Sequence, residues 1–571
     1  MSFDTAAAQQ LDQMIAALRD GEQRWAAEPL ASRRQLLLQF HAHVGAHAAE
    51  WARVAGGIKQ LPADSPLLGE EWISGPWAVL GYAEALADTL GRLADGRSLL
   101  AGYPVRTAPG GRAAVDVLPH NVFERLLLSG FRAEVWMEPG VTERETREQA
   151  GLGQRTPEQT DGIAVVMGAG NVTSIAPLDV LYQLYAYNRV VLLKLNPITD
   201  PLFPVLEQVF APFIDRGYLR IVTGDARIGD HLVTHPGVDA VHITGSAATH
   251  DAIVWGVGAA GAAAKAAGTP RLTKPITSEL GGVAPTIVVP GRWSAADIRF
   301  QAEHIATQRL HNSAFNCIAA QIVIISADWP QKQEFLAALR AALADAPARP
   351  AWYPGCDTRV ADARRLHPQF EAVGGTAERT ALWGLDLADD TETAFTTEYF
   401  GPVLGVAELP GTGLQFLSAA VDAANDRLHG TLGANLVIDN KTMRALGSGL
   451  RESIARLRYG TVGVNAWTGV GYLTARATWG AYPGHELHDI ATGRGAVHNA
   501  LLLHRPERTV VYGPFRPAPR SVLTGEFSLT PKPPWFVTNR TAATTGRRLT
   551  AFAARPRWSA LPGIFASALR G

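Results

Sequence analysis

Cysteine is nearly absent from this chain, which has two cysteines among 571 residues. Two thiols are too few to stabilise a fold of this length through disulfides. Each cysteine is therefore either a candidate reactive residue or a buried apolar one. The sequence also lacks a membrane-length apolar run that is free of charged residues, proline and glycine. Its first residues show no basic segment followed by an apolar one, as a secretory signal would. We therefore expect a cytoplasmic protein with no membrane partner.

The chain also lacks an excess of one charge. It has 52 Lys and Arg and 53 Asp and Glu, which gives a formal net charge of −1. We therefore expect no nucleic-acid partner. Residues 505–571 are the exception, with eleven Lys and Arg, two acids and nine prolines. These prolines argue against a long helix. We expect this basic C-terminal extension to lie extended over an acidic surface of the body or of a neighbouring subunit; binding to a membrane or nucleic acid is the alternative.

Histidine pairs do not assemble into a metal motif. His43 and His47 stand four residues apart on a predicted amphipathic helix, but no third ligand accompanies them. The segment His485-Glu486-Leu487-His488 lacks the spacing of the zinc-protease helix. The sequence predicts no metal site.

Buried strands alternate with helices through the middle of the chain. Apolar runs at 162–167, 190–194, 219–222 and 238–244 are separated by helical patterns. A second such series starts near Thr277 and includes runs at 286–289, 320–325, 433–438 and 460–465. This alternation predicts an α/β protein with doubly wound parallel sheets in two domains, and ligands bind such sheets at the carboxyl ends of the strands.

Three glycine-rich segments compete as a dinucleotide site. The segment Gly256-Val-Gly-Ala-Ala-Gly261 matches the GxGxxG fingerprint, but a helix-like stretch precedes it instead of a strand, so we interpret it as a helix-packing segment. Gly168-Ala-Gly-Asn171 does follow a strand, although it lacks the third glycine. Thr244-Gly245-Ser246 ends a strand and opens a helix, where backbone N–H groups favour a diphosphate.

A cysteine and a glutamate stand out as a reactive pair. Glu279 opens the Glu-Leu-Gly-Gly turn, and Cys317 follows it 38 residues later in Asn316-Cys317-Ile318. A thiolate nucleophile with a carboxylate base would suit this pair. A buried cysteine is otherwise an inert small hydrophobe, and we interpret Cys356 in that way.

The order of these motifs resembles the aldehyde dehydrogenase superfamily over about residues 10–500. The motifs are Asn171, Lys194, Thr244-Gly-Ser246, Glu279-Leu-Gly-Gly282, Cys317, Glu398-Tyr-Phe-Gly-Pro-Val403 and Gly460-Thr-Val-Gly-Val-Asn465. The resemblance implies a Rossmann-like cofactor-binding domain (1–132 and 161–276), a catalytic domain (277–478) and an oligomerisation arm (133–160 and 479–504), followed by the C-terminal extension (505–571). It also implies a homo-oligomer, a dimer or a tetramer.

The resemblance implies NAD(P)-dependent oxidation of an aldehyde to a carboxylic acid. Cys317 would attack the aldehyde, with the oxyanion held by Asn171 and the Cys317 backbone N–H, and Glu279 would activate water against the thioester. Residues that would bind NAD or NADP are Lys194, Thr244, Gly245, Ser246, Gly281, Glu398 and Phe400. The aromatic residues Trp467, Tyr472 and Trp479 suggest a bulky apolar aldehyde, or equally a packed core.

Several positions depart from the family pattern. Ala169 and Gly170 stand where Pro-Trp is usual before Asn171, and Val283 replaces a usual lysine. Pro197 replaces an acidic residue, which makes NADP use plausible. The segment around Cys317 also resembles the coenzyme A-acylating and acyl-CoA reductase branches, which commonly lack the Glu279-type base. Acyl transfer to coenzyme A is therefore one alternative, and a catalytically silent binding protein is another.

Overall fold

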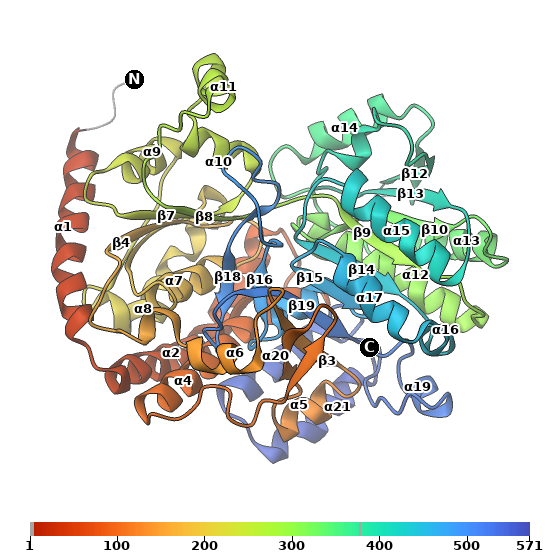
Figure 1. Ribbon diagram of the computed structural model, residues 1–571, viewed down its shortest axis with the longest axis horizontal. Coiled ribbons are helices and arrows are strands. Elements are labelled where there is room, and N and C mark those ends of the chain that lie inside the picture. The colour runs from red at the N-terminus through yellow and green to blue at the C-terminus, as the bar shows by residue number, and fades with distance from the viewer. Residues whose placement is uncertain (1–4, 376–377) are drawn as a thin grey trace.

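Two large β-sheets, each flanked by helices, organise the computed structural model, which describes residues 5–375 and 378–571 (Figure 1). The smaller sheet lies in the lobe that carries the N-terminal helix α1 (Thr5–Ala27), and the larger one crosses the other lobe. A third, two-stranded sheet joins β16 (Thr478–Gly480) to β18 (Ala496–Asn499). The expected α/β class is confirmed.

The six-stranded sheet has the order β17-β8-β7-β4-β5-β6. Its strands are β4 (Ile163–Met167), β5 (Val190–Lys194), β6 (Leu219–Val222), β7 (Ala240–Gly245), β8 (Ile276–Leu280) and β17 (Gly493–Arg494). All neighbours are parallel except β17, which pairs antiparallel with β8. The predicted apolar runs lie on these strands to within about two residues, because strands buried on both faces read as continuous apolar segments.

Helices cover both faces of this sheet and bury its aliphatic residues. They are α1, α2 (Leu30–Ile58), α4 (Ala78–Ala94), α7 (Ile175–Tyr185), α8 (Phe203–Ile214), α9 (Ala226–Thr234) and α10 (Ala247–Val254), whereas α11 (Gly258–Ala267) projects away from the sheet at the top of Figure 1. Val165, Val191 and Leu192 are fully buried in the resulting core. Within the described residues no helix combines the length and apolar character needed to cross a membrane.

The eleven-stranded sheet has the order β1-β2-β3-β19-β15-β14-β9-β10-β13-β12-β11. Its strands are β1 (Val105–Ala108), β2 (Arg112–Leu118), β3 (Arg132–Met137), β9 (Ala284–Val288), β10 (Ala320–Ser326), β11 (Glu371–Val373), β12 (Arg379–Leu385), β13 (Val403–Leu409), β14 (Gly433–Val437), β15 (Thr461–Val464) and β19 (Pro506–Tyr512). The helices of this lobe include α12 (Ala295–Leu310), α13 (Lys332–Asp345), α14 (Cys356–Leu366), α15 (Gly413–Arg427), α16 (Asn440–Leu446), α17 (Ser448–Arg456) and α18 (Thr468–Leu473).

The strands divide differently from the predicted domain boundaries. β1 and β2, placed by prediction in the cofactor-binding domain, pair with β3 in the larger sheet. β8, predicted to open the catalytic domain, belongs to the smaller sheet. β19 lies in the predicted C-terminal extension, yet it runs between β3 and β15 inside the larger sheet. Long-range strand pairing decides membership of a sheet, and local sequence patterns do not report it.

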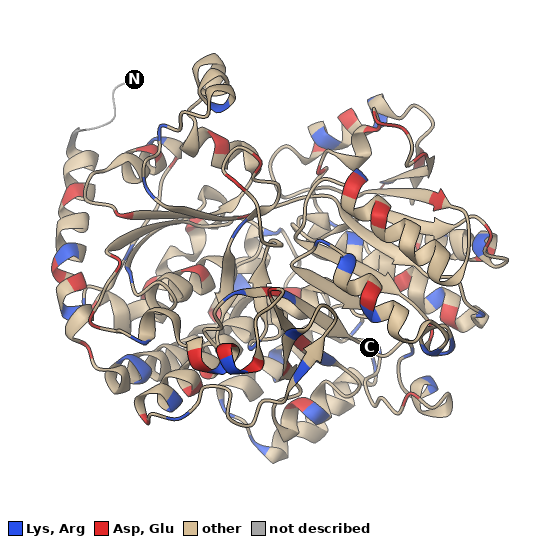
Figure 2. Ribbon diagram, viewed as in Figure 1, with Lys and Arg blue, Asp and Glu red and all other residues tan. Residues whose placement is uncertain are grey.

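The C-terminal extension is more helical than expected. After β19 it forms α19 (Arg520–Leu523), α20 (Ala542–Ala554) and α21 (Leu561–Ala568). α20 forms because it falls in a stretch free of proline. Part of the expectation holds, since basic side chains of this segment pair with acids of the body: Arg516 and Arg520 with Asp297, and Lys532 with Glu303. Figure 2 shows basic and acidic segments interspersed over both lobes in this view.

Candidate active site

Cys317 lies between two elements that fix its position. A tight turn at His311–Ala314 ends α12, and β10 begins three residues after the cysteine. The thiol is partly accessible and lines a small cavity of about 50 Å³. Tyr472 and Trp479 line the same cavity. A thiol at the wall of an enclosed apolar cavity can meet a small organic substrate away from bulk water.

The loop before Cys317 has an unusual backbone. Asn312, Ser313 and Ala314 all have positive φ, at 56°, 56° and 71°. L-residues rarely adopt this region, and three in succession persist only where the surroundings hold them. The Asn312 side chain supplies part of that restraint, because its Nδ2 donates to the backbone oxygens of Phe315 at 3.0 Å and Asn171 at 2.9 Å.

Glu70 holds the same loop from outside. It lies in α3 (Leu68–Trp72), is buried, and accepts the backbone N–H of Asn312 at 3.0 Å. Arg349 donates to both Glu70 oxygens, at 2.8 and 2.6 Å. Burial raises the pKa of Glu70, but the charges of Arg349, His311 and Lys59 outweigh it and keep this pKa below its usual value. No sequence pattern indicated Glu70, which is 242 residues from its partner Asn312.

Asn171 brings a side-chain amide beside this loop. It follows β4 in the turn that leads to α7, as predicted, and it is 7% exposed. Its Nδ2 donates to the backbone oxygen of Phe315 at 2.9 Å, two residues before the nucleophile. A primary amide has two N–H groups, so one is used by this contact and the other is left for a ligand.

Glu279 lies near the end of β8 and faces Cys317. Burial raises the pKa of the Glu279 carboxyl to about 8, an effect only partly offset by hydrogen bonding with the Cys317 thiol and Trp479. Its Oε1 has no hydrogen-bond partner among the described residues. Burial also raises the pKa of the Cys317 thiol well above its usual value, and the charges of Glu279 and Glu398 add to this. A hydrogen bond from the Cys317 backbone N–H opposes this and lowers the pKa of the thiol.

The carboxyl ends of β5 and β7 carry the predicted dinucleotide contacts. Lys194 ends β5, and burial lowers its pKa although the nearby carboxylates of Asp200 and Asp225 oppose this. Gly245 and Ser246 are exposed at the start of α10, where Ser246 is the N-cap. Asp200 Oδ1 is buried and finds no partner in the described part of the chain. An unpaired acceptor beside Lys194 suits a ribose hydroxyl of NAD or NADP.

Glu398 lies directly against the Gly281 turn. A Cβ placed on Gly281 would lie 2.2 Å from the Glu398 carboxylate, so this carboxylate packs directly on the Gly281 backbone. Burial raises the pKa of Glu398 to about 8, and its Oε1 is another acceptor left unpaired by the described residues. Phe400 packs on Phe315 with ring centroids 5.6 Å apart. This places the residues predicted to face a nicotinamide within reach of the cysteine loop.

Gln321, which sequence reasoning did not single out, ties Glu398 to the nucleophile. It lies on β10, four residues after Cys317, and accepts the backbone N–H of Tyr399 at 3.0 Å. Its Nε2 donates to the backbone oxygen of Thr397 at 2.7 Å. A glutamine inside a predicted apolar strand, four residues after the predicted nucleophile, is the sequence signal that could have identified Gln321.

Thr244 does not present its hydroxyl to a cofactor. The side chain is buried and donates to Asp179 Oδ2 at 2.9 Å. Asp179 also pairs with His242 at 3.3 Å and His498 at 3.2 Å, which forms a buried polar network beneath the sheet. Thr244 stays a predicted cofactor contact through its backbone, because the strand turns its hydroxyl inward while Gly245 and Ser246 face solvent.

The GxGxxG segment lies at a helix–helix junction. α10 ends at Val254 and α11 begins at Gly258, so no strand precedes the glycines. A Cβ on Gly261 would come within 2.2 Å of the Gly256 carbonyl oxygen, which shows close backbone packing. The expectation that no strand leads into this fingerprint is confirmed.

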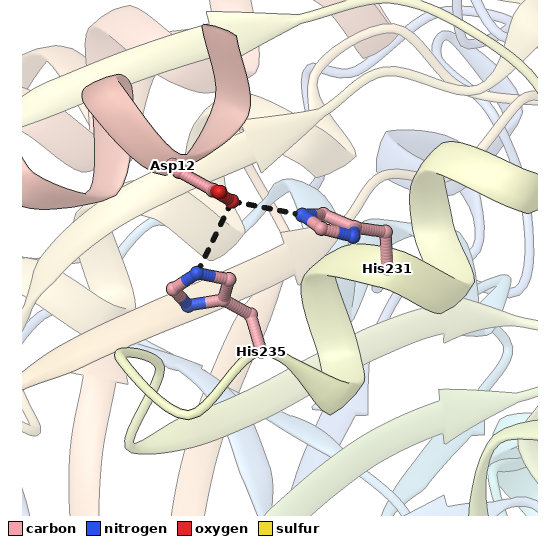
Figure 3. A group of neighbouring side chains, drawn as sticks. All are labelled: Asp12, His231 and His235. Carbon is pink, nitrogen blue, oxygen red and sulfur yellow. Dashed lines mark hydrogen bonds and ion pairs between the residues drawn. The ribbon is translucent and has the colours of Figure 1, made fainter. Parts of the chain in front are cut away.

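Asp12, His231 and His235 form a separate cluster that joins α1 to α9 (Figure 3). Asp12 Oδ1 lies 3.1 Å from His231 Nε2 and 3.3 Å from His235 Nε2. His235 Nδ1 accepts the backbone N–H of Gly237 at 3.0 Å. In the neutral ring this leaves the proton on Nε2, which then donates to Asp12 and offers no lone pair to a metal. The cluster therefore acts as a polar clamp between the two helices.

Comparisons with known proteins agree with this arrangement. Residues 161–359 match the model of the aldehyde dehydrogenase family. A geranial dehydrogenase of Castellaniella defragrans is 25% identical over 267 residues, which is 44% of this chain and 50% of the relative. A coniferyl aldehyde dehydrogenase of Pseudomonas sp. is 26% identical over 226 residues, 37% and 41% of the two chains. The chain thus spans half the length, or less, of these relatives.

Solved structures share the fold over most of the chain. An indole-3-acetaldehyde dehydrogenase in complex with NAD+ aligns with a TM-score of 0.58 at 18% identity, covering 89% of each chain. An NADP-dependent glyceraldehyde-3-phosphate dehydrogenase from Bacillus halodurans, in complex with NADP, has a TM-score of 0.58 at 17% identity, with 88% and 91% covered. At this identity the likeness concerns the fold alone.

Proposed function

We propose that the chain is a member of the aldehyde dehydrogenase superfamily and that it oxidises an aldehyde to a carboxylic acid through a covalent intermediate on Cys317. The observation that carries the proposal is the meeting of three groups around the loop that contains Cys317. These are the Cys317 thiol, the Glu279 carboxyl facing it, and the Asn171 amide held on the loop beside it.

The thiol must lose its proton before it can attack. Burial keeps the pKa of Cys317 high, so the resting form is the neutral thiol. Glu279 is the adjacent group that can accept this proton. Attack on the aldehyde carbon then gives a thiohemiacetal, whose oxyanion would be held by the Asn171 amide and the Cys317 backbone N–H.

The residues present fit NAD or NADP. Lys194 and Asp200 would bind the adenosine ribose, the N-terminus of α10 with Gly245 and Ser246 the diphosphate, and Glu398 with Phe400 the nicotinamide half. The unpaired acceptors Asp200 Oδ1 and Glu398 Oε1 support this assignment. When bound, the nicotinamide supplies the hydride acceptor for the oxidation.

Glu279 would then activate water to hydrolyse the thioester and free the acid. A carboxyl whose pKa is raised to about 8 is well matched to general-base work near neutral pH. The presence of this base favours water over coenzyme A as the acyl acceptor. Acyl transfer to coenzyme A and a silent binding protein gain no support from the relatives, which are named as aldehyde dehydrogenases.

The test is reduced-cofactor formation on a panel of aldehydes, with and without coenzyme A. We expect turnover without coenzyme A, its loss in Cys317→Ser, and a large fall in Glu279→Gln. Turnover that requires coenzyme A and tolerates Glu279→Gln would move the chain to the acylating reaction. Failure to bind either cofactor in a fluorescence titration would support the silent binding protein instead.

A homo-oligomer and a cytoplasmic location remain predictions. Of the predicted oligomerisation arm, β3 is paired inside this chain with β19 of the C-terminal extension. Contacts between subunits would therefore use other surfaces.

A further inference from the structure

A second cavity lies next to the one that contains Cys317. It has a volume of about 190 Å³, against about 50 Å³ for the cavity at the thiol. Ile73, Leu473 and Trp535 line both. Residues common to both cavities show that the two cavities are adjacent. Cys317 lines only the first cavity, so the second one extends it away from the nucleophile.

The C-terminal extension builds one wall of this second cavity. Its apolar contributions include Trp535, Phe552, Ala553, Ile564, Phe565 and Ala568. They oppose apolar side chains of α5 (Val122–Leu127), in which Phe123 meets Phe552 edge-on at 5.1 Å between ring centroids. A segment rich in large apolar residues thus faces the far end of the space that begins at Cys317.

The wall is held firmly against the body. A Cβ on Gly69 of α3 would lie 2.4 Å from the backbone of Ala542, so α3 and α20 pack backbone to backbone. Thr550 donates to the backbone oxygen of Trp72 at 3.3 Å. Close packing of this kind gives the cavity a fixed shape.

Of the charged residues that line the cavity, Arg476 and Glu124 pair with each other, Lys532 pairs with a residue outside the lining, and Glu84 is exposed to solvent. Arg476 contacts Glu124 at 3.2 Å and donates to the Tyr103 hydroxyl at 3.0 Å. Lys532 lies 3.3 Å from Glu303. These ion pairs leave the apolar side chains to set the character of the interior, which favours an uncharged, apolar ligand.

We propose that the two cavities form one tunnel for an aldehyde with an extended apolar tail, whose carbonyl lies at Cys317 and whose tail lies against the C-terminal extension. This inference rests on the proposed function, and it names a substrate class for it. The extension is then a specificity element as well as part of the fold.

Chain-length dependence tests the tunnel directly. For propanal, hexanal and decanal we expect kcat/KM to rise by about four-fold for each added methylene that enters the tunnel. A flat series would overturn the inference, and it would leave the dehydrogenase proposal intact.

Filling the second cavity should remove this dependence. Gly81 lines it from α4, and a Cβ there would stand 3.5 Å from the Ala475 Cβ, an ordinary contact. We expect Gly81→Leu, and Ala568→Phe from the opposite wall, to lower kcat/KM for decanal by about ten-fold or more while propanal is unaffected. Leu523→Ser, at a site that is 82% exposed and outside the cavity lining, is the control and should behave as wild type. Equal losses for propanal and decanal would contradict the inference.

A measurement without turnover separates the two proposals. Alkylation of Cys317 by iodoacetamide, followed by mass spectrometry of its peptide, should be slowed by 1-decanol and not by 1-propanol. Gly81→Leu should abolish this protection. If 1-decanol slows the alkylation of Cys317 but no aldehyde is turned over, the tunnel is supported and the dehydrogenase proposal is contradicted. No protection by 1-decanol in the wild type would overturn the tunnel, whatever the turnover.

Discussion

At the scale of single residues, the protonation state of Glu279 governs the proposed chemistry. Burial raises its pKa to about 8, so the carboxyl is protonated at lower pH and cannot act as a base there. We expect kcat to rise as the pH passes upward through about 8 and then to level off. Steady-state kinetics from pH 6 to 10 measure this.

Glu279→Gln is the matched variant, since it keeps the shape and removes the titration. It should lower kcat by about 10²–10⁴-fold, the usual contribution of a positioned base. It should also abolish the rise near pH 8. A pH profile that is the same in the variant and the wild type would assign the rise to another group.

Asp200 and Asp225 suggest a preference for NAD, although the sequence at Pro197 makes NADP plausible. Both carboxylates lie near Lys194, where a 2′-phosphate would meet like charge. Because like charges brought together cost several kcal/mol, we expect kcat/KM for NAD to exceed that for NADP by about ten-fold or more. Asp200→Asn should narrow the gap, whereas Asp215→Asn, after the C-terminal end of α8, should leave it unchanged. A wild-type preference for NADP would refute this prediction.

Residue types at motif positions were predictable, but the direction of a side chain was not. The spacing from Glu279 to Cys317 identified the two groups that the structure brings together. Thr244 belongs to the same kind of motif, yet its hydroxyl turns inward to Asp179. Asp200 was not predicted, because the family pattern places the acidic residue at position 197. The turn that follows Asn196 brings the Asp200 carboxylate back toward Lys194.

At the scale of elements, the loop before Cys317 depends on a helix from the other end of the sequence. Glu70 of α3 accepts the Asn312 N–H and pairs with Arg349, and both side chains are buried. Glu70→Gln leaves the Arg349 charge buried and uncompensated, so we expect it to lower the free energy of unfolding by about 3–5 kcal/mol. Urea denaturation measures this.

Glu50→Gln is the control, because Glu50 pairs with Arg53 at the surface and its loss should not move the unfolding midpoint. Glu70→Gln should also lower kcat at temperatures where the variant is folded, since Cys317 loses its fixed position. An unchanged urea midpoint in Glu70→Gln would show that the buried pair does not stabilise the fold.

Elements with a strong local pattern were predictable from the sequence. β5 and β6 lie at the residues expected, because each is a continuous apolar run between helices. α20 was not expected, because the C-terminal extension as a whole is rich in proline. The helix occupies a stretch of it that has no proline. Average composition conceals such a local stretch.

At the scale of the molecule, the last segment of the chain completes parts built much earlier. β19 closes the gap between β3 and β15, α20 packs on α3, and α21 lines the second cavity. Arg516 and Arg520 both pair with Asp297, which is 2% exposed, so the extension is anchored by charge as well as by apolar contact. None of these contacts has a local sequence signature, because each joins segments that are far apart in the chain, most of them by hundreds of positions.

The pairing of β3 with β19 makes a prediction about assembly. Ala133 and Val511 are directly opposite in the antiparallel register, and both are buried. Opposed residues in such a pair have the Cα separation that a disulfide requires. We therefore expect Ala133→Cys with Val511→Cys, in a background of Cys317→Ser and Cys356→Ser, to form an intrachain disulfide on oxidation. Non-reducing gel electrophoresis at low and high protein concentration should show one band at the 61.0 kDa of a single chain. Each single cysteine variant in the same background is the control. A band of twice that mass in the double variant alone would mean that β3 pairs with β19 of another chain, and the arm would then link subunits as the sequence predicted.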